Sequence, residues 1–305
     1  MNVWIDTDLA IGTQTPDGSF ADVDDAYAIL QMMLSPDVQI AGISTVFGNT
    51  DVDTATRLSQ ELCATFAPQT PVFRGADSPL NLQQLSETDA THGLRDALRK
   101  QALSILAIGP ATNLAAVLLV EPELAYQIDT VILVAGRRNV SHAFKVGPKQ
   151  EAPFRDLNFD LDPVAFQILL QFDLEIVLVP FEVSHKVWVG EQELTQLAEA
   201  GPAGKWLADR SYDWLAQWKT FGSTGFNPFD LLASAWMLRP HRFQTVEQLV
   251  DIQIGPDDRQ PSGNPFAFKP YLLVSPTLTS SRKVRYVHTP PGDFMVSILE
   301  DFSRT

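Results

Sequence analysis

The strongest constraint on the fold of this chain is a repeated alternation between short apolar runs and longer segments with one polar face. The apolar runs have the length of β-strands, and the longer segments are typical of helices. Strand candidates are residues 3–5, 38–46, 71–73, 103–108, 131–134, 176–179, 271–274 and 284–287. Helix candidates are residues 26–34, 51–66, 163–170 and 293–302, a helix that begins at Thr112, and a mostly helical segment around 191–237. The alternation predicts an α/β fold with a mostly parallel, mixed sheet and helices on both faces.

The length and composition are consistent with this fold. A chain of 305 residues with 45% hydrophobic content can bury a large core. The sequence has no internal repeat, no low-complexity tract and no linker rich in Gly or Ser. We therefore expect one domain that spans residues 1–305.

The charge and the cysteine count exclude several classes of function. A formal net charge of −15 argues against nucleic acid or an anionic membrane as a partner. The single cysteine, Cys63, excludes an internal disulfide and a cysteine-based zinc site. Met1 leads directly into the first strand candidate, and the apolar runs are too short to span a bilayer. We expect a soluble cytoplasmic protein.

Acidic residues crowd the end of the first strand candidate and the start of the first helix. Asp6 and Asp8 follow the strand, and Asp22, Asp24 and Asp25 open the helix. Carboxylates repel one another, so a fold tolerates converging ones only when a cation or a set of hydroxyl donors compensates their charge. Ligands bind at the carboxyl edge of an α/β sheet. The pattern therefore indicates a site for Ca²⁺ or Mg²⁺ and points to hydrolysis. Taken singly, each acid is equally typical of a first-turn residue that complements the helix dipole or of a loop cap.

A series of motifs in fixed order resembles the inosine–uridine nucleoside hydrolase family. The first two are Ile5-Asp6-Thr7-Asp8 and Asp24-Asp25-Ala26, which match the DxD and DDA signature. The later ones are residues 42–49, 71–76, 92–93, 108–114, 158–163 and 179–186, and Asp230 at a helix start. A single motif is weak, whereas the ordered series covers the chain from residue 3 to about residue 240. The resemblance implies a Rossmann-like nucleoside hydrolase fold.

The resemblance also implies an activity and a set of site residues. The activity is hydrolysis of the N-glycosidic bond of ribonucleosides to free base and ribose, with Ca²⁺ as cofactor. The expected partners are a small-molecule nucleoside substrate and the other subunits of a homodimer or homotetramer. Implied metal ligands are the side chains of Asp8, Asp25 and Asp230 and the main-chain carbonyl of Ile108. Asp8 would also be the catalytic base that takes a proton from the attacking water, and Asp6 would orient the site. Implied ribose-binding residues are Asp24, Asn49, Asp156 and Asn158. From local sequence alone, Asn49 can equally be a turn residue that follows Gly48, and Asn158 can be a cap of the following segment.

The chain departs from the family pattern at two loops. Residues 9–23 form an insertion between Asp8 and the Asp24-Asp25 pair, where relatives have only a few residues. Asp156 stands where most members carry Glu, and Gln150 stands where they carry Asn, within the divergent segment 141–155. Contacts to the 5′ end of the ribose are the ones that these changes affect.

The third departure concerns the leaving group. Many members have a histidine before the last aspartate as general acid, whereas this chain has Phe229. A purine-specific branch has an aromatic residue there and stacks the base between rings. Phe229, with a Trp or Tyr from residues 212–218 such as Trp218, would act in this way, which suggests a purine preference. Trp206, Trp214 and Trp218 are alternatively a core stripe of one helix.

Two histidines complete the candidate residues. His92 resembles a pocket-lining family residue that touches the base, and His185 is typical of a structural histidine. Two other classes stay open at this point: a haloacid-dehalogenase-like Mg²⁺ phosphatase, and a non-catalytic paralogue that binds a ribosyl ligand.

Overall fold

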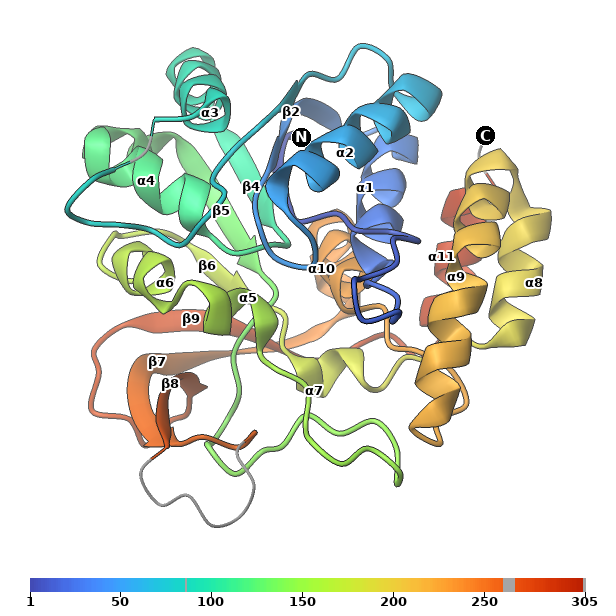
Figure 1. Ribbon diagram of the computed structural model, residues 1–305. Helices are drawn as coiled ribbons and strands as arrows, with labels where there is room; N and C mark the ends of the chain where they lie inside the picture. The colour runs from blue at the N-terminus through green and yellow to red at the C-terminus, as the bar shows by residue number, and fades with distance from the viewer. Residues whose placement is uncertain (86, 260–266, 304–305) are drawn as a thin grey trace.

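The computed structural model describes residues 1–85, 87–259 and 267–303, which form a mixed β-sheet covered by helices (Figure 1). The order of the strands across the sheet is β3-β2-β1-β4-β5-β6-β9-β7-β8. Neighbours from β3 to β9 pair in parallel, and β7 pairs antiparallel with both β9 and β8. The strands are β1 (Asn2–Thr7), β2 (Gln39–Thr45), β3 (Val72–Phe73), β4 (Leu103–Ala107), β5 (Ile128–Leu133), β6 (Ile176–Leu178), β7 (Gln244–Pro256), β8 (Phe268–Val274) and β9 (Lys283–Thr289).

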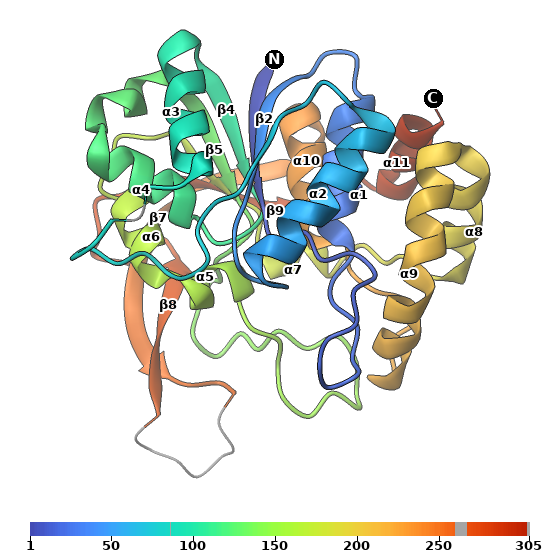
Figure 2. The same cartoon turned by 45° about the horizontal axis from the view of Figure 1, so that its top comes forward.

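Helices cover both faces of this sheet, as Figures 1 and 2 show. One face carries α1 (Asp24–Leu34), α2 (Val52–Phe66), α8 (Glu191–Ala200), α9 (Pro202–Thr220), α10 (Phe229–Leu238) and α11 (Phe294–Phe302). The other carries α3 (Asp89–Lys100), α4 (Thr112–Val120) and α6 (Pro163–Leu169). Short elements connect them: α5 (Leu157–Leu161), α7 (Phe181–Ser184), and the 3₁₀ turns η1 (Pro122–Gln127) and η2 (Pro240–Arg242). Strand β1 shows why both faces are covered: Val3 and Ile5 are buried in one core and Trp4 in the other.

The parallel strands bring their carboxyl ends to one edge of the sheet. Strands β1, β2, β4 and β5 are direct neighbours and run in the same direction. The segments that leave these strands begin with Asp8, Val46, Ile108 and Val134, so these residues lie along the same edge. The α/β fold with a mostly parallel sheet is therefore confirmed, and its topology places the candidate site.

Among the longer elements, α3 and β7 are the two that the apolar pattern does not predict; the short elements α5, α7, η1 and η2 are not predicted either. Helix α3 buries only the narrow face formed by Ala90, Thr91, Leu94 and Leu98, and its other residues are mostly charged or polar. Strand β7 is long but half-buried along most of its length and rich in Glu, Gln and Asp. Neither segment has the continuous apolar run that identifies a buried strand or helix.

The insertion of residues 9–23 forms a small antiparallel loop that is attached to α9. Gln14 and Phe20 form a β-bridge, and Thr13 and Ala21 are joined by a backbone hydrogen bond of 2.9 Å. The side-chain amide of Gln217 in α9 donates to the carbonyl of Phe20 at 3.1 Å and accepts from its N–H at 2.8 Å. The loop is thereby connected to the helix that also carries Trp214 and Trp218.

None of the described helices combines the length and the apolar character that a membrane-spanning segment requires.

Candidate functional site

The carboxyl end of β1 carries two buried aspartates on either side of Thr7. The Oδ1 atom of Asp6 accepts hydrogen bonds from Ser44 Oγ at 2.5 Å and from Asn113 Nδ2 at 2.8 Å. Asn113 Nδ2 also donates to the carbonyl of Thr45 at 3.0 Å. Asp6 therefore connects β1 to the end of β2 and to the start of α4. Burial raises the pKa of Asp6 to about 6, although the two hydrogen bonds oppose this shift.

Asp8 lies beside a glycine that gives it room. Its Oδ2 atom accepts a hydrogen bond from the Asn49 N–H at 2.7 Å, whereas Oδ1 has no partner among the described residues. A Cβ atom at Gly48 would lie 1.8 Å from Oδ2, so no larger residue fits at position 48 in this conformation. Burial, with a smaller contribution from the charge of Asp24, raises the pKa of Asp8 to about 7. One oxygen of Asp8 is thus held and the other is free to accept a proton or a ligand.

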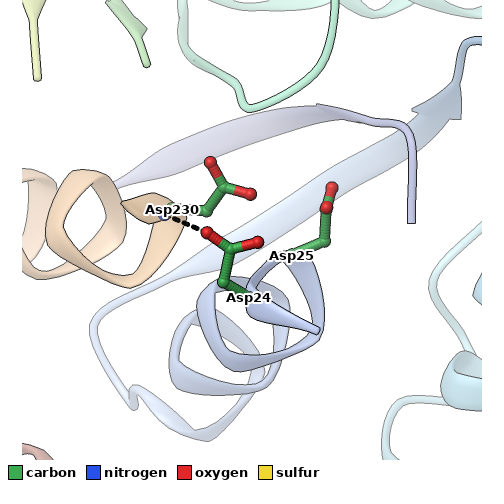
Figure 3. A group of neighbouring side chains, drawn as sticks. All are labelled: Asp24, Asp25 and Asp230. Carbon is green, nitrogen blue, oxygen red and sulfur yellow. Dashed lines mark hydrogen bonds between the residues drawn. The ribbon is translucent and has the colours of Figure 1, made fainter. Parts of the chain in front are cut away.

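Three further carboxylates converge beside Asp8, although one of them is more than 200 positions away in the sequence. Asp24 and Asp25 are the first two residues of α1, and Asp230 is the second residue of α10. One oxygen from each lies within 4.8 Å of the others, and all three side chains are buried (Figure 3). The N–H of Asp230 donates to Asp24 Oδ2 at 2.9 Å. The two helix starts therefore present their acids to one point, where the positive ends of the helix dipoles also lie.

The three acids have no positively charged side chain beside them among the described residues, and their pKa values reflect this. Burial, followed by the charges of Asp8 and Asp24, raises the pKa of Asp25 well above its ordinary value. Burial, followed by the charges of Asp24 and Asp25, does the same for Asp230. Asp25 Oδ1 accepts from Thr7 Oγ1, but its Oδ2 atom has no hydrogen-bond partner among the residues that the structure describes. In the described part of the chain, no Lys, Arg or His forms an ion pair with these acids.

These residues fit a hard divalent cation. Such ions prefer carboxylate and carbonyl oxygens, and the site offers unpartnered oxygens of Asp8 and Asp25 in a buried place. The trio differs from the implied ligand set in one member, because Asp24 belongs to it and Asp8 does not. The carbonyl of Ile108, which follows β4, accepts a hydrogen bond from Asn158 Nδ2 at 3.1 Å. Asp8 and Ile108 therefore lie at the same edge as the trio, from the sides of β1 and β4.

A cavity of about 310 Å³ opens next to the acids. Its polar lining contains Asp22, Asp24, Asn49, Asp156, Asn158 and Asp230, and its aromatic lining contains Phe144, Phe154, Phe181, Trp214, Trp218 and Phe229. The ring centroids of Trp218 and Phe229 are 6.1 Å apart, and those of Phe154 and Trp218 are 5.2 Å apart. The cavity is thus lined both by hydrogen-bonding groups and by flat apolar rings.

The segment 134–158 contributes Asp156 and Asn158 to the polar lining of the cavity. Asp156 Oδ2 accepts from the Gly136 N–H at 2.9 Å, and burial raises the pKa of Asp156 to about 6, with the charge of Arg137 opposing the shift. Gln150 does not line the cavity: its side chain accepts from the Val146 N–H at 2.8 Å and donates to the Phe144 carbonyl at 3.3 Å. At position 150 the side chain therefore bonds to its own loop.

The histidines lie outside the cavity. His92 is on the exposed face of α3, with its Nε2 atom 2.9 Å from a carboxylate oxygen of Glu87, and it is absent from the cavity lining. The structure therefore does not bring His92 to the other candidate residues, because Thr91 and Leu94 occupy the buried face of α3. His185 stacks on Phe181 at 5.4 Å and its Nδ1 atom is 3.1 Å from the carbonyl of Glu182. It also lies outside the lining.

The sequence reasoning missed several cavity residues. Phe144, Phe154 and Arg155 belong to the divergent segment 141–155, which has no periodic pattern, and Phe181 lies within the motif at residues 179–186, which does not indicate its role in the cavity. Trp214 was assigned to the core stripe of α9, yet Trp214 and Trp218 are buried and line the cavity at the same time. Their i, i+4 spacing was the available signal, because it puts both rings on one face of the helix.

The fold and the site together define an α/β protein with a buried acidic site that fits a hard cation. A comparison with protein-family models matches residues 3–264 to the model described as inosine-uridine preferring nucleoside hydrolase. The chain belongs to this family and is a nucleoside hydrolase, an enzyme of the N-glycosidase class.

Comparisons with individual proteins agree with this membership. The chain is 28% identical over 259 residues to the non-specific ribonucleoside hydrolase RihC of Salmonella paratyphi B, over 76% of this chain and 80% of the relative. Its fold is similar to a plant nucleoside hydrolase, PpNRh1, with a TM-score of 0.79, 19% identity and coverage of 100% and 99%. It is also similar to a purine-preferring ribonucleoside hydrolase from Gardnerella vaginalis, with a TM-score of 0.76, 18% identity and coverage of 100% and 98%. Because the sequence identities to these two solved structures are below 20%, the structural comparisons show a similarity of fold alone.

Proposed function

We propose that this protein hydrolyses the N-glycosidic bond of ribonucleosides in a Ca²⁺-dependent reaction and prefers purine nucleosides. The observation that carries the proposal is the convergence of Asp24, Asp25 and Asp230 at a cavity that is also lined by aromatic rings. A ribonucleoside has the matching division into a sugar with hydroxyl groups and a flat base.

The carboxylates and the carbonyl at the sheet edge are the proposed cation ligands: Asp8, Asp25, Asp230 and the main chain of Ile108, with Asp24 adjacent. When bound, the ion supplies Lewis acidity toward water and toward two neighbouring sugar hydroxyls. Because Asp25 and Asp230 are buried without a cationic partner in the described chain, they have a strong electrostatic reason to bind one.

Asp8 is the proposed general base. Its Oδ2 atom is held by the Asn49 N–H, and this bond fixes the plane of the carboxylate. Its Oδ1 atom is buried and has no partner among the described residues, so it can accept a proton from the attacking water. Asp6, which is hydrogen-bonded to Ser44 and Asn113, holds the end of β1 and so positions Asp8.

The remaining polar residues are proposed to bind and orient the ribose. Asp24, Asn49, Asp156 and Asn158 line the cavity beside the acids. Carboxylates accept hydrogen bonds from sugar hydroxyls, whereas Asn both donates and accepts. Carboxylates near the sugar also stabilise the positive charge that develops on the ring as the glycosidic bond breaks.

The base is proposed to lie against Phe229 and Trp218. Both rings line the cavity, and no histidine of the described chain does. Stacking raises the basicity of a purine, so a proton from solvent can activate the leaving group. A purine has the larger stacking face, and this difference supports the purine preference. We further propose that the enzyme acts as a homodimer or homotetramer.

The test is a panel of purine and pyrimidine nucleosides, assayed for free base and ribose with and without a chelator. The proposal predicts equal amounts of base and ribose, faster release from purines, and loss of activity with the chelator that Ca²⁺ restores. Hydrolysis of p-nitrophenyl phosphate without nucleoside hydrolysis would instead indicate a phosphatase. Binding of ribose without any turnover would indicate a non-catalytic paralogue.

A further inference from the structure

A second cavity of about 370 Å³ adjoins the first one. Arg155 and Arg259 line both cavities, so their side chains lie where the two meet. Arg155 directly precedes Asp156, and Arg259 lies three residues after the end of β7. Lys269, the second residue of β8, also lines the second cavity. Two acids, Asp160 and Asp257, line this cavity as well. In a chain with a net charge of −15, a cavity whose lining has more cations than acids requires an explanation.

The positive charge of Lys269 is compensated by two close acids. The Lys269 Nζ atom is 2.8 Å from Asp160 Oδ2 and 3.0 Å from Asp258 Oδ1. Asp258 Oδ2 is also 2.8 Å from the buried Arg137 Nη1. Lys269, Arg137, Asp160 and Asp258 therefore form a chain of alternating charges with no net charge.

The two arginines keep unused donors beside this neutral network. Arg155 Nε is 3.8 Å from Asp160 Oδ2, which Lys269 already occupies at shorter distance. In the described chain the guanidinium of Arg259 forms no hydrogen bond and no ion pair, and only its backbone N–H bonds to Asp257 Oδ1, at 3.0 Å. Since a guanidinium has five N–H donors, both groups can bind an anion without breaking a close ion pair of the protein.

The position of these donors indicates which part of a substrate they would reach. Arg155 is adjacent in sequence to Asp156, a proposed ribose-binding residue, whereas Trp214, Trp218 and Phe229 belong to α9 and α10. Helix α5 connects the two cavities, because its Asn158, also a proposed ribose-binding residue, lines the first and its Asp160 lines the second. The second cavity therefore adjoins the first on the side of the proposed ribose-binding residues. In the proposed function, the two neighbouring hydroxyls of the ribose ring bind at the cation held by the buried aspartates. The 5′ hydroxyl is therefore the one that can carry a substituent into the second cavity.

We propose that the second cavity is a phosphate subsite, and that the enzyme also hydrolyses nucleoside 5′-monophosphates to free base and ribose 5-phosphate. This inference rests on the proposed function. Paired guanidinium groups match the geometry and charge of a phosphate monoester. In the reaction a water oxygen bonds to C1′, the bond from C1′ to the base nitrogen breaks, and the base takes up a proton. The phosphate ester remains intact.

The first test compares kcat/KM for inosine 5′-monophosphate with kcat/KM for inosine. We expect the wild-type enzyme to hydrolyse both, and the ratio of the two values to fall about tenfold or more in Arg155→Gln and in Arg259→Gln, because each variant loses a charged hydrogen-bond donor to phosphate. Arg57→Gln is the matched control, since Arg57 is an exposed partner of Glu61 on α2, and its ratio should not change. Hydrolysis of inosine but not of its monophosphate, or an unchanged ratio in both variants, would overturn the subsite and leave the proposed function intact.

The second test measures binding by calorimetry and does not depend on turnover. Ribose 5-phosphate should bind more tightly than ribose, and Arg155→Gln and Arg259→Gln should weaken its binding about tenfold or more. Inorganic phosphate, used alone, should bind more weakly than ribose 5-phosphate. If neither nucleoside nor nucleotide is hydrolysed, the proposed function fails, and this measurement alone decides the subsite. Equal binding of inorganic phosphate and ribose 5-phosphate, or no binding of either, would contradict it.

Discussion

At the scale of single residues, the site depends on carboxylates that the folded protein buries close together. Asp8, Asp24, Asp25 and Asp230 are all buried, and the pKa of each is raised, chiefly by burial. Such an arrangement is unfavourable in a metal-free protein, because each ionised carboxylate loses hydration and repels its neighbours. Its presence in a folded chain is explained if a cation compensates the charge.

The Asp25→Ala variant tests this explanation. We expect it to lose bound Ca²⁺ and activity together while it stays folded, because the site loses a charged ligand. Its melting temperature without metal should be at least that of the wild type, since one repelling carboxylate is gone, but Ca²⁺ should no longer raise it. Thermal unfolding with and without Ca²⁺ measures both effects. The control is Asp37→Ala, an exposed acid away from the site; full activity in Asp25→Ala would refute the assignment.

The Asp8→Asn variant separates proton transfer from shape. An amide has nearly the same size as the carboxylate and can still accept the Asn49 hydrogen bond, but it cannot take the proton of the attacking water. We expect kcat to fall by about two orders of magnitude or more at saturating Ca²⁺, with an unchanged circular-dichroism spectrum. A reduction of only a few-fold would mean that another group is the base.

The Phe229→Ala variant tests how the leaving base is activated. If stacking replaces a histidine acid, kcat for inosine should fall about tenfold. An activated p-nitrophenyl riboside should be affected less, because its leaving group needs no proton. Phe229→Leu is the matched control, since it retains an apolar side chain and removes only the ring. Equal losses on both substrates, or faster hydrolysis of pyrimidine nucleosides by the wild type, would count against stacking.

At the scale of elements, the site is assembled where loops follow parallel strands, and the insertion of residues 9–23 adds a loop of this chain's own. Asp22 from this insertion lines the cavity, and Gln217 attaches residue Phe20 to α9. The family resemblance identified the insertion, because relatives have only a few residues between Asp8 and the Asp24-Asp25 pair. It did not predict the attachment, because a bond between residues 20 and 217 leaves no local signature.

The Gln217→Ala variant should release this loop. It removes two hydrogen bonds between the loop and α9, and hydrogen–deuterium exchange of residues 13–21 should become about tenfold faster or more. KM should rise, because the loop contributes Asp22 to the cavity, whereas the melting temperature should change little. Gln196→Ala, at an exposed position of α8, is the control. Unchanged exchange in Gln217→Ala would show that other contacts hold the loop.

At the scale of the whole molecule, the alternating pattern predicted the sheet and most helices, but not how distant segments meet. Apolar runs identified β1, β4, β5 and β6 because these strands are buried on both faces. The half-buried β7 lacked this signal. The approach of Asp230 to Asp24 and Asp25 was available only through the family resemblance, since it results from the packing of α10 against α1. The aromatic lining of the cavity depends in part on residues of the irregular loop 141–155, whose sequence has no periodic pattern.

The buried acids also predict how Ca²⁺ and pH act together on stability. The pKa values of Asp6 and Asp8 rise from 3.8 to about 6 and about 7 on folding, so the metal-free folded state binds more protons than the unfolded state in this range. The stability that these groups contribute to the metal-free fold is therefore fully present below about pH 3.8 and is lost as the pH rises toward about 7. Because Ca²⁺ competes with these protons, it should raise the melting temperature more at about pH 8 than at about pH 5. A Ca²⁺ effect that is independent of pH would contradict this account.

The central claim is that the converging carboxylates bind the cation on which hydrolysis depends, and anomalous diffraction from a crystal soaked in Ca²⁺ tests it most directly. The account predicts one anomalous peak at the carboxyl edge of the sheet, coordinated by Asp8, Asp25 and Asp230 side chains and the Ile108 carbonyl, that is absent in Asp25→Ala crystals. A fully active enzyme whose crystals show no peak between these residues would contradict it.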